Sequence, residues 1–308
     1  MQDRGHLLTE QRNPRSWHID RMSIPEAVEL MNSEDATVAP AVAAARDDIC
    51  RAIELVVAAF QAGGRLIYVG AGTSGRLAVL DAAECPPTFL SPPRMVRGVI
   101  AGGWKALRRA VEGAEDHPED GAAAMDKLKV GPRDVVMGIT TGGTTPFVHG
   151  ALARARERGA RTIFFGCVAE DHVSLPVDVS IRVLVGPEVI TGSTRLKAGT
   201  ATKMVLNMIS TISMVRIGKV YQNLMVDVNT RANRKLIDRG QRIIMTITGL
   251  DRPAAAKLLE EAGGHVKTAL VMHCRKVDRA TARRLLAAHR GHLAPILNAR
   301  TQNWDAQA

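Results

Sequence analysis

The chain has 308 residues, of which 46% are hydrophobic and only 3% aromatic, and its net charge is +10. No apolar run reaches the roughly 18 residues needed to span a bilayer, and the N-terminus lacks a signal-peptide core, so we expect a cytoplasmic protein without membrane contact. Basic residues are spread along the chain without an RNA-binding aromatic motif, which argues against nucleic acid as a partner.

The first 65 residues predict helices. Ser23 followed by Glu26 is a capping box with Pro25 in the first turn, so a helix is expected to begin there. A longer helix is expected from Val38 to Ala62, where apolar residues recur at helical spacing before Gly63-Gly64.

Strands and helices then alternate, which is typical of an α/β fold with a doubly wound parallel sheet and helices on both faces. The expected strands are Leu66–Val69, Met95–Ile100, Val135–Ile139, Thr162–Phe165 and Val177–Val185. The helices between them are expected to begin near Gly75, Trp104, Thr145 and, as a short helix, Asp171. A largely apolar helix should cover Ala198–Arg216, and short helices follow from residue 233 onward.

The first glycine-rich turn, Gly70 to Gly75, joins an apolar strand to a helix. Backbone N–H groups in such a turn converge on an anion at the helix N-terminus, where the helix dipole also favours negative charge. We therefore expect Gly72, Thr73 and Ser74 to contact a phosphate-bearing ligand. The alternative is that the glycines only permit a tight turn.

A second turn of the same kind runs from Gly138 to Phe147, with Pro146 suited to the first helical turn. Loops at the carboxyl ends of parallel strands mark the crevice where ligands bind in open α/β sheets. Four of its residues are therefore expected to bind phosphate: Thr140, Thr141, Gly143 and Thr145.

Two classes of cofactor are disfavoured. Gly70, Gly72 and Gly75 match the dinucleotide-binding spacing, but Ser91-Pro-Pro-Arg stands where the acidic ribose clamp would be, so we reject that reading. The four cysteines have no Cys-x-x-Cys spacing, so we expect neither a zinc site nor a disulfide framework.

The third stretch, Val185 to Lys203, reads Val-Gly-Pro-Glu-Val-Ile-Thr-Gly-Ser-Thr-Arg-Leu-Lys-Ala-Gly-Thr-Ala-Thr-Lys. Together with residues 70–88 and Gly113-Ala-Glu-Asp, it closely resembles the N-acetylmuramic acid 6-phosphate etherases. These belong to the sugar-isomerase (SIS) superfamily and are related to the glucokinase regulatory proteins. The resemblance extends from Leu8-Thr-Glu-x-Arg-Asn-Pro to the end of the helical region.

The resemblance implies a cofactor-independent lyase that cleaves the D-lactyl ether of N-acetylmuramate 6-phosphate in amino-sugar recycling. By position, Glu84 corresponds to the acid/base residue and Glu115 to the second catalytic carboxylate. We expect the third stretch to contact the sugar phosphate through Glu188, Ser193, Thr194 and Lys197.

The helix after the first turn is expected to end at Glu84, before Pro86-Pro87, which would place this carboxyl at the negative pole and favour the protonated acid. Ser74 and Glu84 would then lie about 15 Å apart along one helix. A hexose phosphate bridges that distance poorly. Either the second turn holds the phosphate or two subunits share the site, so we expect a homodimer.

Three domains are expected. They are an N-terminal arm and helix (1–56), an SIS sugar-phosphate domain (57–221) and a C-terminal helical region (222–308) that resembles a ubiquitin-associated three-helix bundle.

The second turn departs from the family, whose members usually carry Ala-Ser-Gly-Arg-Thr-Pro-Tyr where this chain has residues 141–147. Gly142 replaces the serine expected to bind phosphate, and Thr144 replaces the arginine. Two alternatives to the etherase stay open: a non-catalytic sugar-phosphate regulator of the glucokinase-regulatory type, and an aldose–ketose isomerase.

Overall fold

A computed structural model describes residues 5, 7–228, 230 and 234–298. The chain divides into two compact units. The first comprises residues 1–83 and 93–210, and the second comprises residues 84–92 and 211–308.

A five-stranded parallel sheet forms the centre of the first unit, in the order β2-β1-β3-β4-β5. Its strands are β1 (Leu66–Gly70), β2 (Val96–Ile100), β3 (Val135–Ile139), β4 (Arg161–Gly166) and β5 (Val179–Arg182). All five expected strands are confirmed, with ends that differ by a few residues. Because β1 and β3 are buried throughout, they read as continuous apolar runs.

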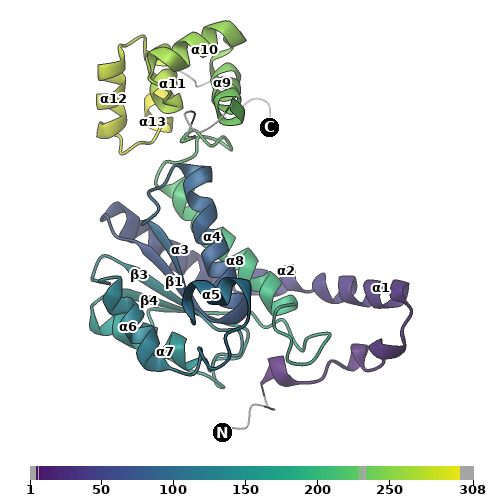
Figure 1. Cartoon of the computed structure of the whole chain (residues 1–308). Helices are drawn as coiled ribbons and strands as arrows, with labels where there is room; N and C mark the ends of the chain where they lie inside the picture. The colour runs from purple at the N-terminus through teal and green to yellow at the C-terminus, as the bar shows by residue number, and fades with distance from the viewer. Residues whose placement is uncertain (1–4, 6, 229, 231–233, 299–308) are drawn as a thin grey trace. The chain divides into compact units, whose positions relative to one another are not determined.

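Helices cover both faces of this sheet, as the alternating pattern predicts (Figure 1). On one face, α7 (Pro146–Glu157) packs on β1, β3 and β4, and α6 (Pro118–Lys127) packs on α7. On the other face, α3 (Arg46–Gln61) contacts β1, β3 and β5. Three more helices belong wholly or partly to this unit: α4 (Gly72–Phe89), α5 (Gly103–Arg108) and α8 (Lys197–Arg216).

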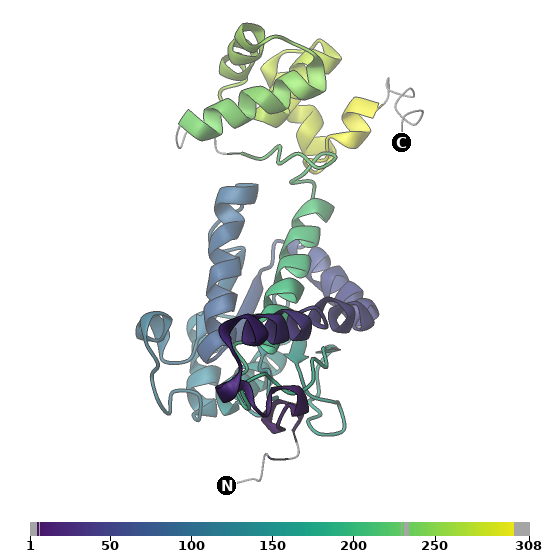
Figure 2. The same cartoon turned by 90° about the vertical axis from the view of Figure 1, so that its right-hand side faces the viewer.

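The N-terminal arm consists of three short 3-10 segments, Leu8–Glu10, Pro14–Ser16 and Ile19–Arg21, followed by α1 (Ile24–Asp35) and α2 (Val38–Ala44). Ser23 caps α1 and Glu26 completes the capping box, as expected. Helix α1 projects away from the sheet in Figure 1, and in Figure 2, where that side faces the viewer, it lies in front of the sheet.

The second unit has its own apolar core, centred on Ile244, Leu259, Leu270 and Ile296. Its helices are α9 (Arg234–Thr248), α10 (Arg252–Glu261), α11 (Val266–Arg275), α12 (Arg279–Ala288) and the short α13 (Ala294–Leu297). The expected short helices are therefore present, with one more turn of helix after them.

The structure corrects three local expectations. The helix expected over residues 38–62 is two helices, interrupted at Ala45. The helix expected near Asp171 is a turn, in which the His172 N–H donates to the Ala169 carbonyl. Helix α4 does not stop at Glu84 but continues through Pro86 and Pro87.

The continuation of α4 has a simple backbone basis. Proline φ is compatible with a helix, although Pro86 and Pro87 remove two N–H donors, and the Leu90 N–H donates to the Pro86 carbonyl at 2.9 Å. The helix ends where Leu90 turns to a positive φ of 49°. Glu84 therefore lies more than one turn before the end of the helix, and the expected placement at its negative pole is wrong.

Among the described residues, no helix is both long and apolar enough to cross a membrane.

Candidate functional site

The two glycine-rich turns follow neighbouring strands. Gly70, the last residue of β1, pairs with Ile139, the last residue of β3. The connection after β1 leads to β2 on one side, and the connection after β3 leads to β4 on the other side. The strand order therefore reverses between β1 and β3. Open parallel sheets bind ligands in the crevice at such a switch point. The two turns therefore lie side by side at the edge where a ligand is expected.

The first turn is closed by tight backbone packing. A Cβ on Gly75 would lie 2.5 Å from Ile100 Cγ1 and 2.8 Å from the Gly70 carbonyl oxygen, so glycine is required there. Helix α4 begins at Gly72, whose φ is +51°. The N–H groups of its first turn, which include Thr73 and Ser74, point out of the helix end, where an anion can accept their hydrogen bonds.

The second turn contains backbone N–H groups that make no hydrogen bond among the described residues. Thr140 is buried, and its hydroxyl pairs with that of Thr145 at 2.8 Å. The N–H of Gly143, which has a φ of +80°, donates to the Thr140 carbonyl, and the Thr141 carbonyl accepts from Cys167. In the described part of the chain, the N–H groups of Gly142 and Thr144 have no acceptor. This turn therefore keeps backbone donors for a ligand.

The third stretch reaches the first turn at the start of α8. A Cβ on Gly199 would lie 3.6 Å from the Thr73 methyl carbon. Ser193 and Thr194, both half-buried, precede this contact. The start of α8 therefore lies close to the first turn at Gly199.

Glu188 and Lys197 have structural contacts. Glu188 is fully buried, and its carboxylate accepts from the backbone N–H groups of Lys197 and Ala198 at the start of α8. Burial raises the pKa of Glu188, although these hydrogen bonds and the Lys197 charge oppose the shift. The Lys197 ammonium lies 2.6 Å from the Glu34 carboxylate, and both side chains are buried. Both side chains therefore make contacts that stabilise the fold.

The two predicted catalytic carboxylates are, by contrast, exposed. Glu84 lies on α4, and Glu115 lies in the loop before α6, where its carbonyl accepts from the Phe147 N–H. The structure records no hydrogen bond or ion pair of either carboxylate with another described residue. Glu115 lines a cavity of about 160 Å³ together with Gly72 and Arg76.

Sequence reasoning missed three polar residues of the first unit. Arg76, in the first turn of α4, brings a cation to the Glu115 cavity. Asp81 is buried and accepts hydrogen bonds from Tyr68, Asn207 and Ser210. Thr9 of the arm lies beside the second turn. Arg76 directly follows the glycine motif, so the sequence alone could have identified it. The residues near Asp81 and Thr9 lie too far along the chain to be predicted from it.

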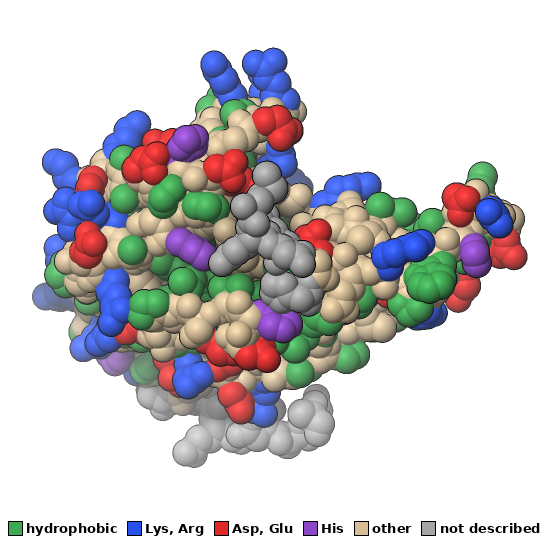
Figure 3. All heavy atoms as spheres, turned by 90° about the horizontal axis from the view of Figure 1, so that it is seen from below, with side chains coloured by type: hydrophobic (Ala, Val, Ile, Leu, Met, Phe, Trp, Pro, Cys, Tyr) green, Lys and Arg blue, Asp and Glu red, His purple; other side chains and the backbone are tan. Residues whose placement is uncertain are grey.

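Charge is dispersed on the face drawn in Figure 3, where basic and acidic side chains alternate instead of forming one basic patch. No cluster of three or more potential metal-ligating His, Cys, Asp or Glu side chains occurs within residues 5, 7–228, 230 and 234–298.

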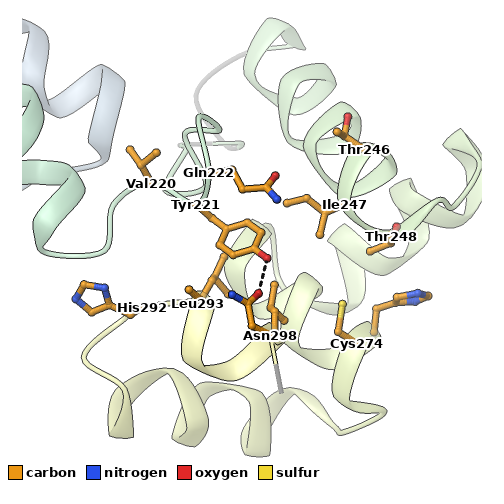
Figure 4. A pocket seen from close by; sticks show the side chains of 13 residues that line it. Val220, Tyr221, Gln222, Thr246, Ile247, Thr248, Cys274, His292, Leu293 and Asn298 are labelled. Atoms are coloured by element: carbon orange, nitrogen blue, oxygen red, sulfur yellow. Dashed lines mark hydrogen bonds between the residues drawn. The ribbon is translucent and has the colours of Figure 1, made fainter. Parts of the chain in front are cut away.

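A larger cavity, of about 730 Å³, lies within the second unit (Figure 4). Residues 220–222, the end of α9, His273 and Cys274 of α11, and residues 292–298 line it. The Tyr221 hydroxyl donates to the Asn298 side chain at 3.1 Å across it. None of the predicted site residues lines this cavity, so its size alone does not make it the active site.

Comparison with known proteins finds an SIS-domain family and close relatives over nearly the whole chain. Residues 48–156 match the model of the glucokinase regulatory protein N-terminal SIS domain. The N-acetylmuramic acid 6-phosphate etherase of Gloeothece citriformis is 56% identical over 298 residues, covering 97% of each chain. That of Trichormus variabilis is 57% identical over 95% of each chain. Among solved structures, a phosphoheptose isomerase from Neisseria gonorrhoeae matches 62% of this chain and 99% of its own, with 17% identity and a TM-score of 0.48.

Proposed function

Because the chain belongs to the N-acetylmuramic acid 6-phosphate etherases, we propose that Glu84 and Glu115 are the two carboxylates that carry out its lyase reaction. The reaction cleaves the D-lactyl ether at C3 of N-acetylmuramate 6-phosphate and gives N-acetylglucosamine 6-phosphate and D-lactate. The observation that carries the proposal is the position of Glu115, which lines one cavity with Gly72 of the first turn.

The chemistry requires one base and one acid. The open-chain sugar has an aldehyde that acidifies the proton at C2, so a carboxylate can remove it. A carboxylic acid protonates the lactate oxygen as the C3–O bond breaks, and water then adds at C3 with the roles reversed. The aldehyde itself accepts the electrons, so this scheme uses no cofactor. We assign the C2 proton to Glu115, and lactate protonation and water activation to Glu84.

The contacts of three buried carboxylates support this choice. Asp81 and Glu188 are buried and accept several hydrogen bonds, and Glu34 is paired with Lys197. Glu84 and Glu115 are exposed, so they can reach a ligand and exchange protons with it. The phosphate would be held by the N–H groups and hydroxyls of the two glycine-rich turns.

Two substitutions test the roles separately. Glu84→Gln and Glu115→Gln should each lower D-lactate release by about 10²- to 10⁴-fold. In heavy water, Glu84→Gln should still exchange the C2 proton of N-acetylmuramate 6-phosphate, whereas Glu115→Gln should not. Glu112→Gln, in the same cavity as Glu115, is the matched control and should retain turnover.

The opposite results are informative. Normal lactate release by Glu84→Gln would remove it from the mechanism, and loss of activity in Glu112→Gln would move the assignment to Glu112. A non-catalytic regulator would release no D-lactate even in the wild-type protein.

We also propose that the protein is a homodimer. Ile24, Val28 and Met31 form one apolar face of α1 at helical spacing, and their exposures are 82%, 61% and 38%. Such a face on a projecting helix suits burial against a second copy. The mass measured by light scattering should be twice that of the chain, and Val28→Asp should shift it toward the monomer. A monomeric wild-type protein would contradict the proposal.

A further inference from the structure

Thr9 is a buried polar residue with one unused group. Its side chain has no exposed surface, and its backbone carbonyl accepts a hydrogen bond from the Gly192 N–H at 3.2 Å. Its hydroxyl oxygen is buried and has no hydrogen-bond partner among the described residues. Buried hydroxyls normally have a partner, so an unpaired one calls for an explanation.

The Thr9 hydroxyl faces the second glycine-rich turn. A Cβ on Gly142 would have a single neighbour within 4 Å from elsewhere in the chain, the Thr9 hydroxyl oxygen at 3.9 Å. A side chain at position 142 would therefore meet only this hydroxyl, and the N–H of Gly142 is also without an acceptor in the described residues. Two unused donors, one backbone and one side-chain, thus lie close to Gly142.

We propose that Thr9 is a phosphate-binding residue, and that an oxygen of the sugar phosphate enters the space beside Gly142 and accepts a hydrogen bond from the Thr9 hydroxyl. This proposal rests on the proposed sugar-phosphate site and adds to it a ligand from the N-terminal arm. It also explains how the turn can work with glycine at position 142. Where glycine brings no hydroxyl of its own, the arm supplies one.

The Gly192 contact gives Thr9 a second role. Because the Thr9 carbonyl binds Gly192 and its hydroxyl faces Gly142, this residue lies between the second turn and the third stretch. A phosphate bound at Thr9 would therefore join elements that are far apart in sequence.

Thr9→Val tests the proposal, because valine keeps the shape and removes the hydroxyl. The dissociation constant of N-acetylglucosamine 6-phosphate, measured by calorimetry, should rise about tenfold or more, as expected for a hydrogen bond to a charged group. Thr9→Ser should stay within about threefold of the wild type, since it retains the hydroxyl. In turnover, Thr9→Val should raise KM for N-acetylmuramate 6-phosphate more than it lowers kcat.

Thermal unfolding separates binding from a structural role. Without ligand, the midpoint of Thr9→Val should equal or exceed that of the wild type, because an unpaired buried hydroxyl is removed. The midpoint increase caused by N-acetylglucosamine 6-phosphate should shrink. Gly142→Ala, which places a methyl group 3.9 Å from the Thr9 hydroxyl oxygen, should weaken binding in the same way.

A Thr9→Val protein that binds N-acetylglucosamine 6-phosphate as tightly as the wild type would overturn the proposal. So would a lower ligand-free midpoint with an unchanged ligand-induced shift, because that combination indicates a purely structural hydroxyl. These binding measurements need no catalysis, so they remain decisive even if Glu84 and Glu115 prove not to be the catalytic pair.

Discussion

The turns after β1 and β3 have equivalent places at the edge of the sheet, but they are built differently. In the first, Gly70 and Gly75 pack so closely that no side chain fits on Gly75. In the second, a side chain on Gly142 would meet almost nothing. Similar glycine motifs are therefore packed differently: at Gly75 the glycine closes the turn, whereas at Gly142 a side chain would have a single neighbour.

The largest expected effect is on the closed turn. Gly75→Ala should lower the free energy of unfolding by about 2 to 3 kcal/mol, because the new methyl group would overlap Ile100 and the Gly70 carbonyl. Urea unfolding measures this change. Gly142→Ala is the matched control and should change stability by less than about 1 kcal/mol.

Equal destabilisation by the two substitutions would mean that both glycines only close turns. The comparison is sharpest if Gly75→Ala lowers stability while Gly142→Ala lowers phosphate affinity.

A smaller effect concerns pH. Burial raises the pKa of Asp81 on α4, although hydrogen bonds from Asn207, Ser210 and Tyr68 oppose the shift. Because the folded pKa is raised, the stability that Asp81 contributes is fully present below its unfolded pKa of about 3.9 and is lost as the pH rises through the folded value. Helix α7, after the second turn, buries only apolar side chains. Of these two helices, α4 rather than α7 should therefore make the free energy of unfolding depend on pH.

The measurement is the difference in unfolding free energy between the wild type and Asp81→Asn from pH 4 to pH 7. The stability of the wild type relative to the variant should fall as the pH rises. A difference that grows with pH would mean that the hydrogen bonds to Asp81 outweigh its burial.

Much of the first unit could be predicted from the sequence because its signals are local. Buried parallel strands read as short apolar runs, and glycine-rich turns followed by helices mark the carboxyl ends of β1 and β3. The capping box at Ser23 was equally readable. The end of α4 was not, because a Pro-Pro pair normally stops a helix, and here the helix loses two donors and continues.

Long-range pairing could not be predicted. Nothing near Lys197 indicates that its partner is Glu34, 163 positions earlier, and nothing near Thr9 indicates that it faces Gly142. Glu188 and Lys197 were predicted as ligands because they belong to the stretch that carries the family resemblance. Their contacts with the start of α8 and with Glu34 could not be predicted from that stretch.

The contacts of the N-terminal arm also bear on the order of folding. Asn13 donates to the Pro187 carbonyl, Ser16 donates to the Val189 carbonyl, and Thr9 accepts from Gly192. During synthesis the arm leaves the ribosome first but has to wait for about 180 further residues before these partners exist. At roughly 5 to 20 residues per second, that wait is on the order of 10 to 35 seconds. The arm is thus made first and docked late, so a nascent chain without residues 187–192 should leave it accessible to protease.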